Sequence, residues 1–198
     1  MGNKFAVFFT IFLFTISFGV FAGGESEAQE SMEDPSSIES EDEIFDPELI
    51  SQAGFQPLSE PQHSVQFTVP LLNEEMASMQ DFEGKLTVLN FWATWCPPCR
   101  EEMPSMQSLY ETMGDDNFAI FAIDLQESEQ TVEDFIDQNG YTFTFAIDTT
   151  GNVARQYGVR SIPTSFLISP EGYVIGAWVG GREWDTPAMI EAFQELAQ

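Results

Sequence analysis

The chain contains two cysteines, which stand three positions apart in the sequence W-C-P-P-C as Cys96 and Cys99. A second thiol within reach of the first can resolve the mixed disulfide that forms during thiol–disulfide exchange. A purely structural disulfide is a poor interpretation, because the stabilisation that a cross-link gives grows with the length of the loop it closes. The two intervening residues make that loop almost as small as a disulfide allows. The spacing therefore predicts a redox-active dithiol.

The elements expected around the motif give the two thiols different roles. Residues 86–92, LTVLNFW, have the apolar run of a buried strand, and a helix is expected to begin at Cys96. The unpaired amides and the positive dipole end of a helix start stabilise a thiolate, which is the attacking species. Cys96 is therefore expected to be the exposed nucleophile, and Cys99, one turn further, the shielded thiol that resolves the mixed disulfide.

Pro97 and Pro98 separate the two cysteines. Proline suits the first turn of a helix, because the amides there have no intrahelical partner to lose. The two prolines also remove two amide donors that could have served the sulfur of Cys96. We expect them to tune the redox potential of the dithiol in a direction that the sequence does not fix, so that reduction and oxidation of substrates both stay open.

Strand and helix patterns alternate along the rest of the chain. Strands are expected at 86–92, 118–124, 143–148, 164–169 and 173–179, and helices from Cys96, at 131–138, at 152–157 and after Asp185 or Thr186. The last two strands are joined by Pro170-Glu171-Gly172, whose turn chemistry predicts a hairpin. This order predicts an α/β fold in which a central mixed β-sheet is flanked by helices.

Further motifs lie in order along the same region. They are F-T-V-P-L-L, D-F-E-G-K-L-T-V-L-N-F-W-A-T-W-C-P-P-C-R-E-E-M-P, Y-G-V, and I-P-T followed by F-L-I-S-P-E-G. Together they resemble the TlpA/ResA group of bacterial thioredoxin-like oxidoreductases over residues 62–198. The resemblance implies a thioredoxin-like fold and an extracytoplasmic protein, often anchored by an N-terminal segment. Many members are reductants, including of apocytochrome c before haem attachment.

The resemblance also implies roles for individual residues. Cys96 corresponds to the attacking thiol, Cys99 to the resolving thiol, and Pro163 to a cis-proline that faces them. Ile162 and Pro163 are then expected to form a backbone edge that binds an extended substrate peptide. Trp95, beside the motif, is expected to cover the dithiol and to contribute to the same substrate-binding surface.

One position departs from ordinary thioredoxin. Thioredoxin has a buried aspartate on the strand before its active site, where this chain has Asn90, which cannot accept a proton near neutral pH. The resemblance instead supplies Glu102 as the buried acid. Helix spacing agrees, since Cys99 and Glu102 are three residues apart and share a face. A solvated surface carboxylate is the alternative for Glu102, and the neighbouring Glu101 is expected at the surface.

Two segments precede the expected domain of residues 62–198. Residues 5–22 are almost wholly apolar, which predicts that residues 1–22 are a signal peptide or an N-terminal membrane anchor. Residues 23–61 contain twelve Asp and Glu and no Lys or Arg, so they are expected to form an acidic disordered linker. The protein is therefore expected outside the cytoplasm, in the periplasm or cell envelope, either secreted or tethered through residues 5–22.

The expected domain has 21 acidic and five basic residues, a net charge of −16. This balance excludes nucleic acid as a partner, because phosphate binding needs clustered Lys and Arg. The expected partners are protein disulfides or dithiols, together with a thiol reductant in the membrane that supplies electrons. No cofactor is expected.

Other functions of related folds have weaker support. A peroxidase-type redoxin normally has its reactive Cys in a Pro-rich, Thr-containing loop with an Arg nearby, a pattern that is not found. A metal-binding chaperone normally pairs two Cys with a late His, but the single histidine, His63, precedes the motif. Two thiols and one distant His also fall short of a zinc site or a hydrolase triad, so no metal site is expected. Met103, Met106 and Met113 recur at helical spacing and are expected to pack in the core.

Overall fold

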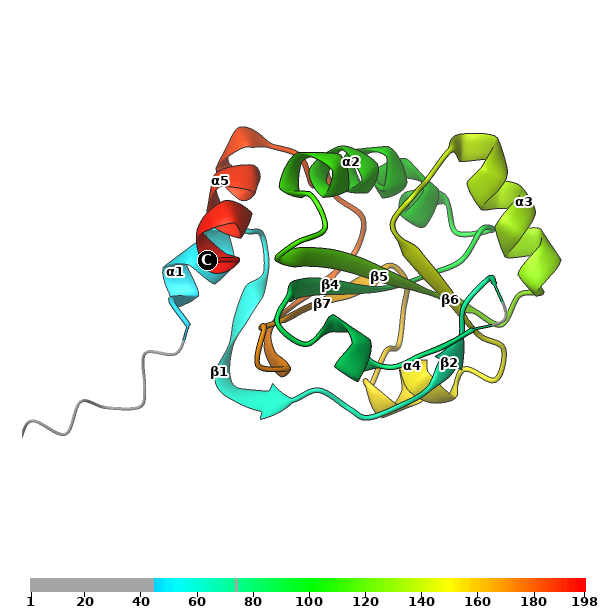
Figure 1. The fold of residues 1–198 in the computed structure, drawn as a ribbon, viewed down its shortest axis with the longest axis horizontal. Helices are drawn as coiled ribbons and strands as arrows, with labels where there is room; N and C mark the ends of the chain where they lie inside the picture. The colour runs from blue at the N-terminus through cyan, green and yellow to red at the C-terminus, as the bar shows by residue number, and fades with distance from the viewer. Residues whose placement is uncertain (1–44, 74) are drawn as a thin grey trace, which may run out of the picture. The chain divides into compact units, whose positions relative to one another are not determined.

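The computed structural model describes residues 45–73 and 75–198, which belong to one compact unit, Ser40–Gln198. Six strands in this part of the chain form one sheet in the order β1-β8-β7-β4-β5-β6 (Figure 1). Their bounds are β1 Gln56–His63, β4 Leu86–Trp92, β5 Phe118–Leu125, β6 Thr144–Asp148, β7 Thr164–Ile168 and β8 Tyr173–Val179. β4, β5 and β6 pair in parallel, whereas β7, β8 and β1 pair antiparallel with their neighbours. The expected mixed sheet is confirmed.

Helices cover both faces of this sheet. Their bounds are α1 Pro47–Gln52, η2 (a 3-10 helix) Met79–Phe82, α2 Pro97–Met113, α3 Glu129–Asn139, α4 Asn152–Gln156 and α5 Pro187–Leu196. Figure 1 shows α2, α3 and α5 on one side of the sheet and α4 on the other. A short antiparallel pair, β2 Val69–Pro70 and β3 Met76–Ala77, packs on the α4 side. No helix in the described part of the chain has the length and apolar character that a bilayer span requires.

β4 lies inside the sheet and is buried along its whole length. Because side chains alternate across a strand, Val88 and Trp92 enter the core beneath α2, α3 and α5, while Leu89 and Phe91 enter the core on the α4 face. Asn90 shares the face of Val88 and Trp92, so it is a polar side chain directed toward α2. The alternation of β4 thus decides which side chain lies beneath the helix that carries the dithiol.

Most of the expected elements are confirmed. The strands expected at 86–92 and 173–179 have those bounds, and the other three expected strands differ from theirs by one residue at one end. Thr186 is the N-cap of α5, where its side chain accepts a hydrogen bond from the amide of Met189 at 3.4 Å. Pro187 occupies the first turn, as expected.

The expected extent of the acidic linker is wrong at its C-terminal end. Residues 47–63 form α1 and β1, and β1 pairs with β8 at the edge of the main sheet. Ile50, Ala53 and Phe55 are buried in the core beneath α5, which stabilises a segment of otherwise acidic composition. Residues 1–22 and 23–44 lie outside the described residues, so the leader and the remainder of the linker stay predictions.

Candidate active site

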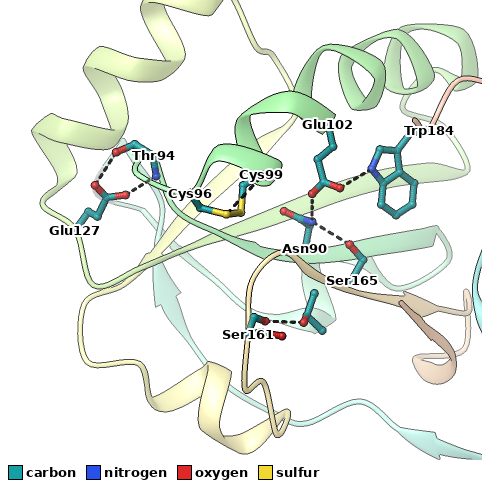
Figure 2. Close-up of a disulfide and its surroundings, with 10 residues drawn as sticks. Asn90, Thr94, Cys96, Cys99, Glu102, Glu127, Ser161, Ser165 and Trp184 are labelled. Carbon is teal, nitrogen blue, oxygen red and sulfur yellow. Dashed lines mark hydrogen bonds between the residues drawn. A yellow bond between two sulfur atoms is a disulfide. The ribbon is translucent and has the colours of Figure 1, made fainter. Parts of the chain in front are cut away.

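Cys96 and Cys99 form a disulfide at the start of α2, with their Cα atoms 5.3 Å apart (Figure 2). Cys96 is the N-cap of the helix, and its sulfur accepts a hydrogen bond from the amide of Cys99 at 3.3 Å. This arrangement puts the Cys96 sulfur at the positive end of the helix dipole. Pro97 and Pro98 form the first turn of α2, as expected, and both are exposed.

The exposure of the active-site loop differs from the expectation at Cys96. The side chain of Cys96 is only 3% exposed in the disulfide state, so it is nearly as buried as Cys99, which is 0% exposed. Trp95 is 65% exposed, and its expected position over the dithiol stays a prediction. The loop therefore presents an indole to solvent beside a disulfide that lies just beneath the surface.

The Ile162–Pro163 peptide bond is cis, as expected. Pro163 is buried and Ile162 is half-buried. The next residue, Thr164, pairs with Phe91 near the C-terminal end of β4. Pro163 therefore lies at the edge of the sheet from which the active-site loop also emerges. The carbonyl of Pro163 accepts a hydrogen bond from the amide of Gly180 at 2.8 Å, so its backbone is fixed from the β8 side.

Glu102 lies on α2 and is only 2% exposed, which confirms the expected burial and contradicts the alternative of a surface carboxylate. Asn90 donates a hydrogen bond to its Oε1 atom, and the indole of Trp184 donates one to its Oε2 atom, each at 3.1 Å. The amide of Asn90 also donates to Ser165 Oγ at 2.9 Å. Figure 2 shows this chain of contacts beneath α2, on the side that carries the disulfide.

Burial raises the pKa of Glu102 from 4.5 to about 7. Hydrogen bonds from Trp184, Asn90 and the backbone of Arg182 lower the pKa, as does the positive charge of Arg182, but desolvation outweighs them. A carboxyl group with such a pKa changes its protonation state near neutral pH. It therefore has the proton affinity that a group exchanging protons with a thiol requires.

Two acidic residues that were not predicted from the sequence, Asp124 and Glu127, lie near the active-site loop, and Figure 2 shows Glu127 on the opposite side of the disulfide from Glu102. Glu127 accepts hydrogen bonds from the amide of Thr94 at 2.6 Å and from its hydroxyl at 2.7 Å, which fixes the loop two residues before Cys96. Asp124, at the end of β5, is fully buried, and burial together with the nearby Glu127 carboxylate raises its pKa to about 8. The sequence signal that could have identified Asp124 is its position directly after the apolar run of β5.

Trp184 is the other residue that sequence analysis missed. It is 1% exposed, and its amide donates a hydrogen bond to Ser105 Oγ at 3.1 Å in addition to the indole bond to Glu102.

Among the described residues, no group of three His, Cys, Asp and Glu is placed to hold a metal ion. His63 stacks on Tyr173 with ring centres 4.0 Å apart, on β1 and β8.

Comparisons with known proteins agree with this geometry. The model of the AhpC/TSA family matches residues 62–177. The chain is 38% identical over 135 residues to the thiol-disulfide oxidoreductase ResA of Halalkalibacterium halodurans, covering 68% of this chain and 75% of that protein. It is 34% identical over 144 residues to ResA of Bacillus subtilis, covering 73% and 79%. A Chlorobium tepidum structure named as the thiol:disulfide interchange protein DsbE superposes with a TM-score of 0.61 at 31% identity, covering 71% and 99%.

Proposed function

This chain belongs to the AhpC/TSA family and is a thiol–disulfide oxidoreductase of the ResA type, and we propose that it reduces protein disulfides outside the cytoplasm. The observation that carries the proposal is the Cys96–Cys99 disulfide at the start of α2, with the buried carboxyl group of Glu102 on the same side of the helix. A thiol pair at a helix start supplies the attacking thiolate, and a buried acid supplies proton exchange.

The proposed reaction begins with the reduced dithiol. The thiolate of Cys96 attacks one sulfur of a substrate disulfide, and the other substrate sulfur leaves as a thiolate that takes up a proton. Cys99 then loses its proton and attacks the Cys96 sulfur, which releases the first substrate sulfur and forms the enzyme disulfide. The second substrate sulfur also leaves as a thiolate and takes up a proton. Counting the proton that Cys96 released when it ionised, two electrons and two protons pass from the dithiol to the substrate disulfide.

Glu102 has the proposed role of accepting the proton that Cys99 loses in the second step. The two residues are three positions apart on α2, and Glu102 is directed to the buried side of the helix by Asn90 and Trp184. Its pKa of about 7 lets it hold a proton at neutral pH without binding it too tightly to release. The proposed order of attack rests on the position of Cys96 at the N-cap of α2, where the helix dipole stabilises its thiolate, because both cysteines are buried in the disulfide form.

The proposed substrate surface surrounds the dithiol. Trp95 and Val179 are 65% and 62% exposed, and Val179 pairs with Thr164, directly after the cis-proline. An extended peptide can lie along the backbone of Ile162 and Pro163 while its apolar side chains contact these two exposed residues. The family resemblance makes apocytochrome c a substrate candidate, and the apolar segment of residues 5–22 supports export. The proposed electron donor is a thiol reductant in the membrane.

Trapping of the mixed disulfide tests the function. Cys99→Ser keeps the nucleophile and removes the resolving thiol, so covalent complexes with substrate proteins should accumulate on non-reducing gels of envelope extracts. Cys96→Ser should give almost none and is the matched control. Apocytochrome c among the trapped proteins would support the substrate proposal, whereas a broad set of envelope proteins would indicate a general oxidoreductase. Equal trapping by both variants would contradict the assigned order of attack.

A further inference from the structure

The loop between β8 and α5, residues 180–186, follows the first two turns of α2. Gly181 lies against Pro98, close enough that an added Cβ would stand 2.8 Å from the Pro98 carbonyl oxygen. Trp184 then bonds Glu102 through its indole and Ser105 through its amide. Figure 2 shows the indole of Trp184 directed at the Glu102 carboxyl group. The loop thus lies close to Pro98 and is hydrogen-bonded through Trp184 to two residues of the active-site helix, Glu102 and Ser105.

Arg182 connects this loop to a more distant part of the chain. Its guanidinium carbon lies 4.3 Å from the ring centre of Trp178 and 5.4 Å from that of Trp184. Cation–π contacts of this kind favour one orientation of both groups. The guanidinium also donates a hydrogen bond from Nη1 to the carbonyl oxygen of Gly54. Arg182 is therefore held between the tryptophan that contacts Glu102 and the end of α1.

Gly54 follows α1, in the segment of the chain that precedes the residues matched by the family model, 62–177. It has a φ of +87°, in the left-handed region that favours glycine. A Cβ at this position would overlap the guanidinium of Arg182. Gly54 therefore suits this position for two reasons. Glycine adopts the positive φ without strain, and its lack of a side chain leaves room for the Arg182 guanidinium.

We propose that Arg182 and Trp184 are positioning residues for Glu102, and that the α1 segment acts on the same carboxyl group by holding Arg182 through Gly54. The proposal deepens the function above and rests on it for the consequence, which is that a segment outside the family match adjusts proton exchange at the dithiol. The placement of Glu102 itself is independent of that function.

The groups that face Glu102 and can change its pKa come from the loop before α5, from β4 and from α2. Arg182, from the loop before α5, supplies the positive charge, and its own pKa is lowered by burial and raised by Glu102. Asn90 from β4 and Trp184 are neutral donors. On α2 itself, the dithiol adds a titratable group only when it is reduced. A titration of the disulfide form therefore reports the influence of Arg182 and the two donors without interference from the thiols.

The test is an NMR titration of the Glu102 side-chain carboxyl carbon in the disulfide form of the protein. Arg182→Gln removes the charge and should raise the pKa of Glu102, and Trp184→Phe removes the indole donor and should raise it by about one unit. Gly54→Ala should also raise it, because the new methyl group displaces the guanidinium. A second readout, the rate of Cys96 alkylation against pH in the reduced protein, should shift in the same direction.

Gly84→Ala is the matched control for Gly54→Ala. Gly84 has a φ of +83°, so it imposes the same backbone strain, but an added Cβ there meets no atom within 4 Å. This variant should leave the pKa of Glu102 unchanged. In an Arg182→Gln background, Gly54→Ala should have no further effect on that pKa, because the group through which it acts is gone.

An unchanged Glu102 titration in both Arg182→Gln and Trp184→Phe would overturn the proposal, and an equal effect of Gly54→Ala with and without Arg182 would overturn the role of α1. If Trp184→Phe fails to fold, the Arg182 and Gly54 variants decide the question. A shifted titration with an unshifted alkylation profile would uphold the positioning of Glu102 while contradicting its proposed role in proton exchange.

Discussion

The indole of Trp184 donates a hydrogen bond to Glu102 over 3.1 Å, although the two residues are 82 positions apart in the chain. The opposite oxygen of the same carboxyl group accepts a hydrogen bond from Asn90 at 3.1 Å. The protein therefore keeps its acid on the helix that carries the dithiol and surrounds it with neutral donors from two other elements.

Glu102→Gln should preserve the fold and impair proton exchange. Glutamine has nearly the same shape but cannot take up the proton that Cys99 loses, so the release of substrate from the mixed disulfide should slow on the order of 100-fold at neutral pH. The profile of thiol alkylation against pH should also lose the change near pH 7 that accompanies ionisation of Glu102. Glu101→Gln, at the exposed neighbouring position on the helix, is the control and should behave as the parent protein.

Asp124→Asn should change how stability depends on pH. Burial raises the pKa of Asp124 from 3.8 to about 8, so the folded protein holds a proton through a window in which the unfolded chain releases it. The free energy of unfolding contributed by this group is therefore fully present below about pH 4 and falls as the pH rises toward about 8. Asparagine does not titrate, so the variant should gain at least about 1 kcal/mol on the parent across this window. Urea unfolding at several pH values measures the difference, and parallel stability curves would contradict the prediction.

Ile50→Ala should show that α1 is part of the folded domain. Ile50 is 2% exposed and packs in the core with residues of α5. Removing its side chain should lower the free energy of unfolding by about 2–4 kcal/mol in a single cooperative transition. Leu58→Ala, at an exposed position on β1, should cost less than about 0.5 kcal/mol. Similar small effects of both changes would mean that residues 45–61 contribute little to stability.

Trp95→Ala should weaken the reaction with protein substrates without affecting the fold. The indole is 65% exposed, so its loss leaves the core intact, but exposed tryptophans beside a binding site often carry much of the affinity. We expect kcat/KM for a protein disulfide to fall about tenfold, and the rate with a small aromatic disulfide to change little. Met76→Ala removes another exposed apolar side chain, on β3, and should leave both rates unchanged. An equal loss with both substrates would place Trp95 in the chemistry of the dithiol instead.

The sequence was sufficient to predict the dithiol and most of the sheet, because each depends on local spacing or on an apolar run. The burial of Glu102 was implied by the family resemblance, and its spacing from Cys99 agreed with it. The W-C-P-P-C motif is local: its two prolines suit the first turn of a helix, and this turn brings the two cysteines together. The contacts of Glu102 with Trp184 and Arg182 could not be predicted, since they depend on how a loop far along the chain packs along α2. No periodicity in residues 180–186 indicates that packing.

The N-terminal part of the domain was missed for a different reason. Residues 45–61 have the acidic and proline-containing composition of an unstructured segment, and only Ile50, Ala53 and Phe55 are buried within it. β1 itself has an almost wholly exposed surface, so its side chains carry no alternating pattern. It forms because its backbone pairs with β8, and backbone pairing leaves no mark on side-chain composition.

The position of β1 has a consequence for the behaviour of many copies of this protein together. A strand at the edge of a sheet offers free amides and carbonyls to which the edge of another molecule can add, which is a common route to aggregation. β1 occupies the side of β8 that would otherwise be open, and its own sequence includes Pro57 and Pro61, which have no amide hydrogen to donate. A neighbouring strand that approached this edge would find an incomplete set of donors. β1 thus covers the edge of β8 and, because of its two prolines, offers fewer backbone donors of its own to another molecule.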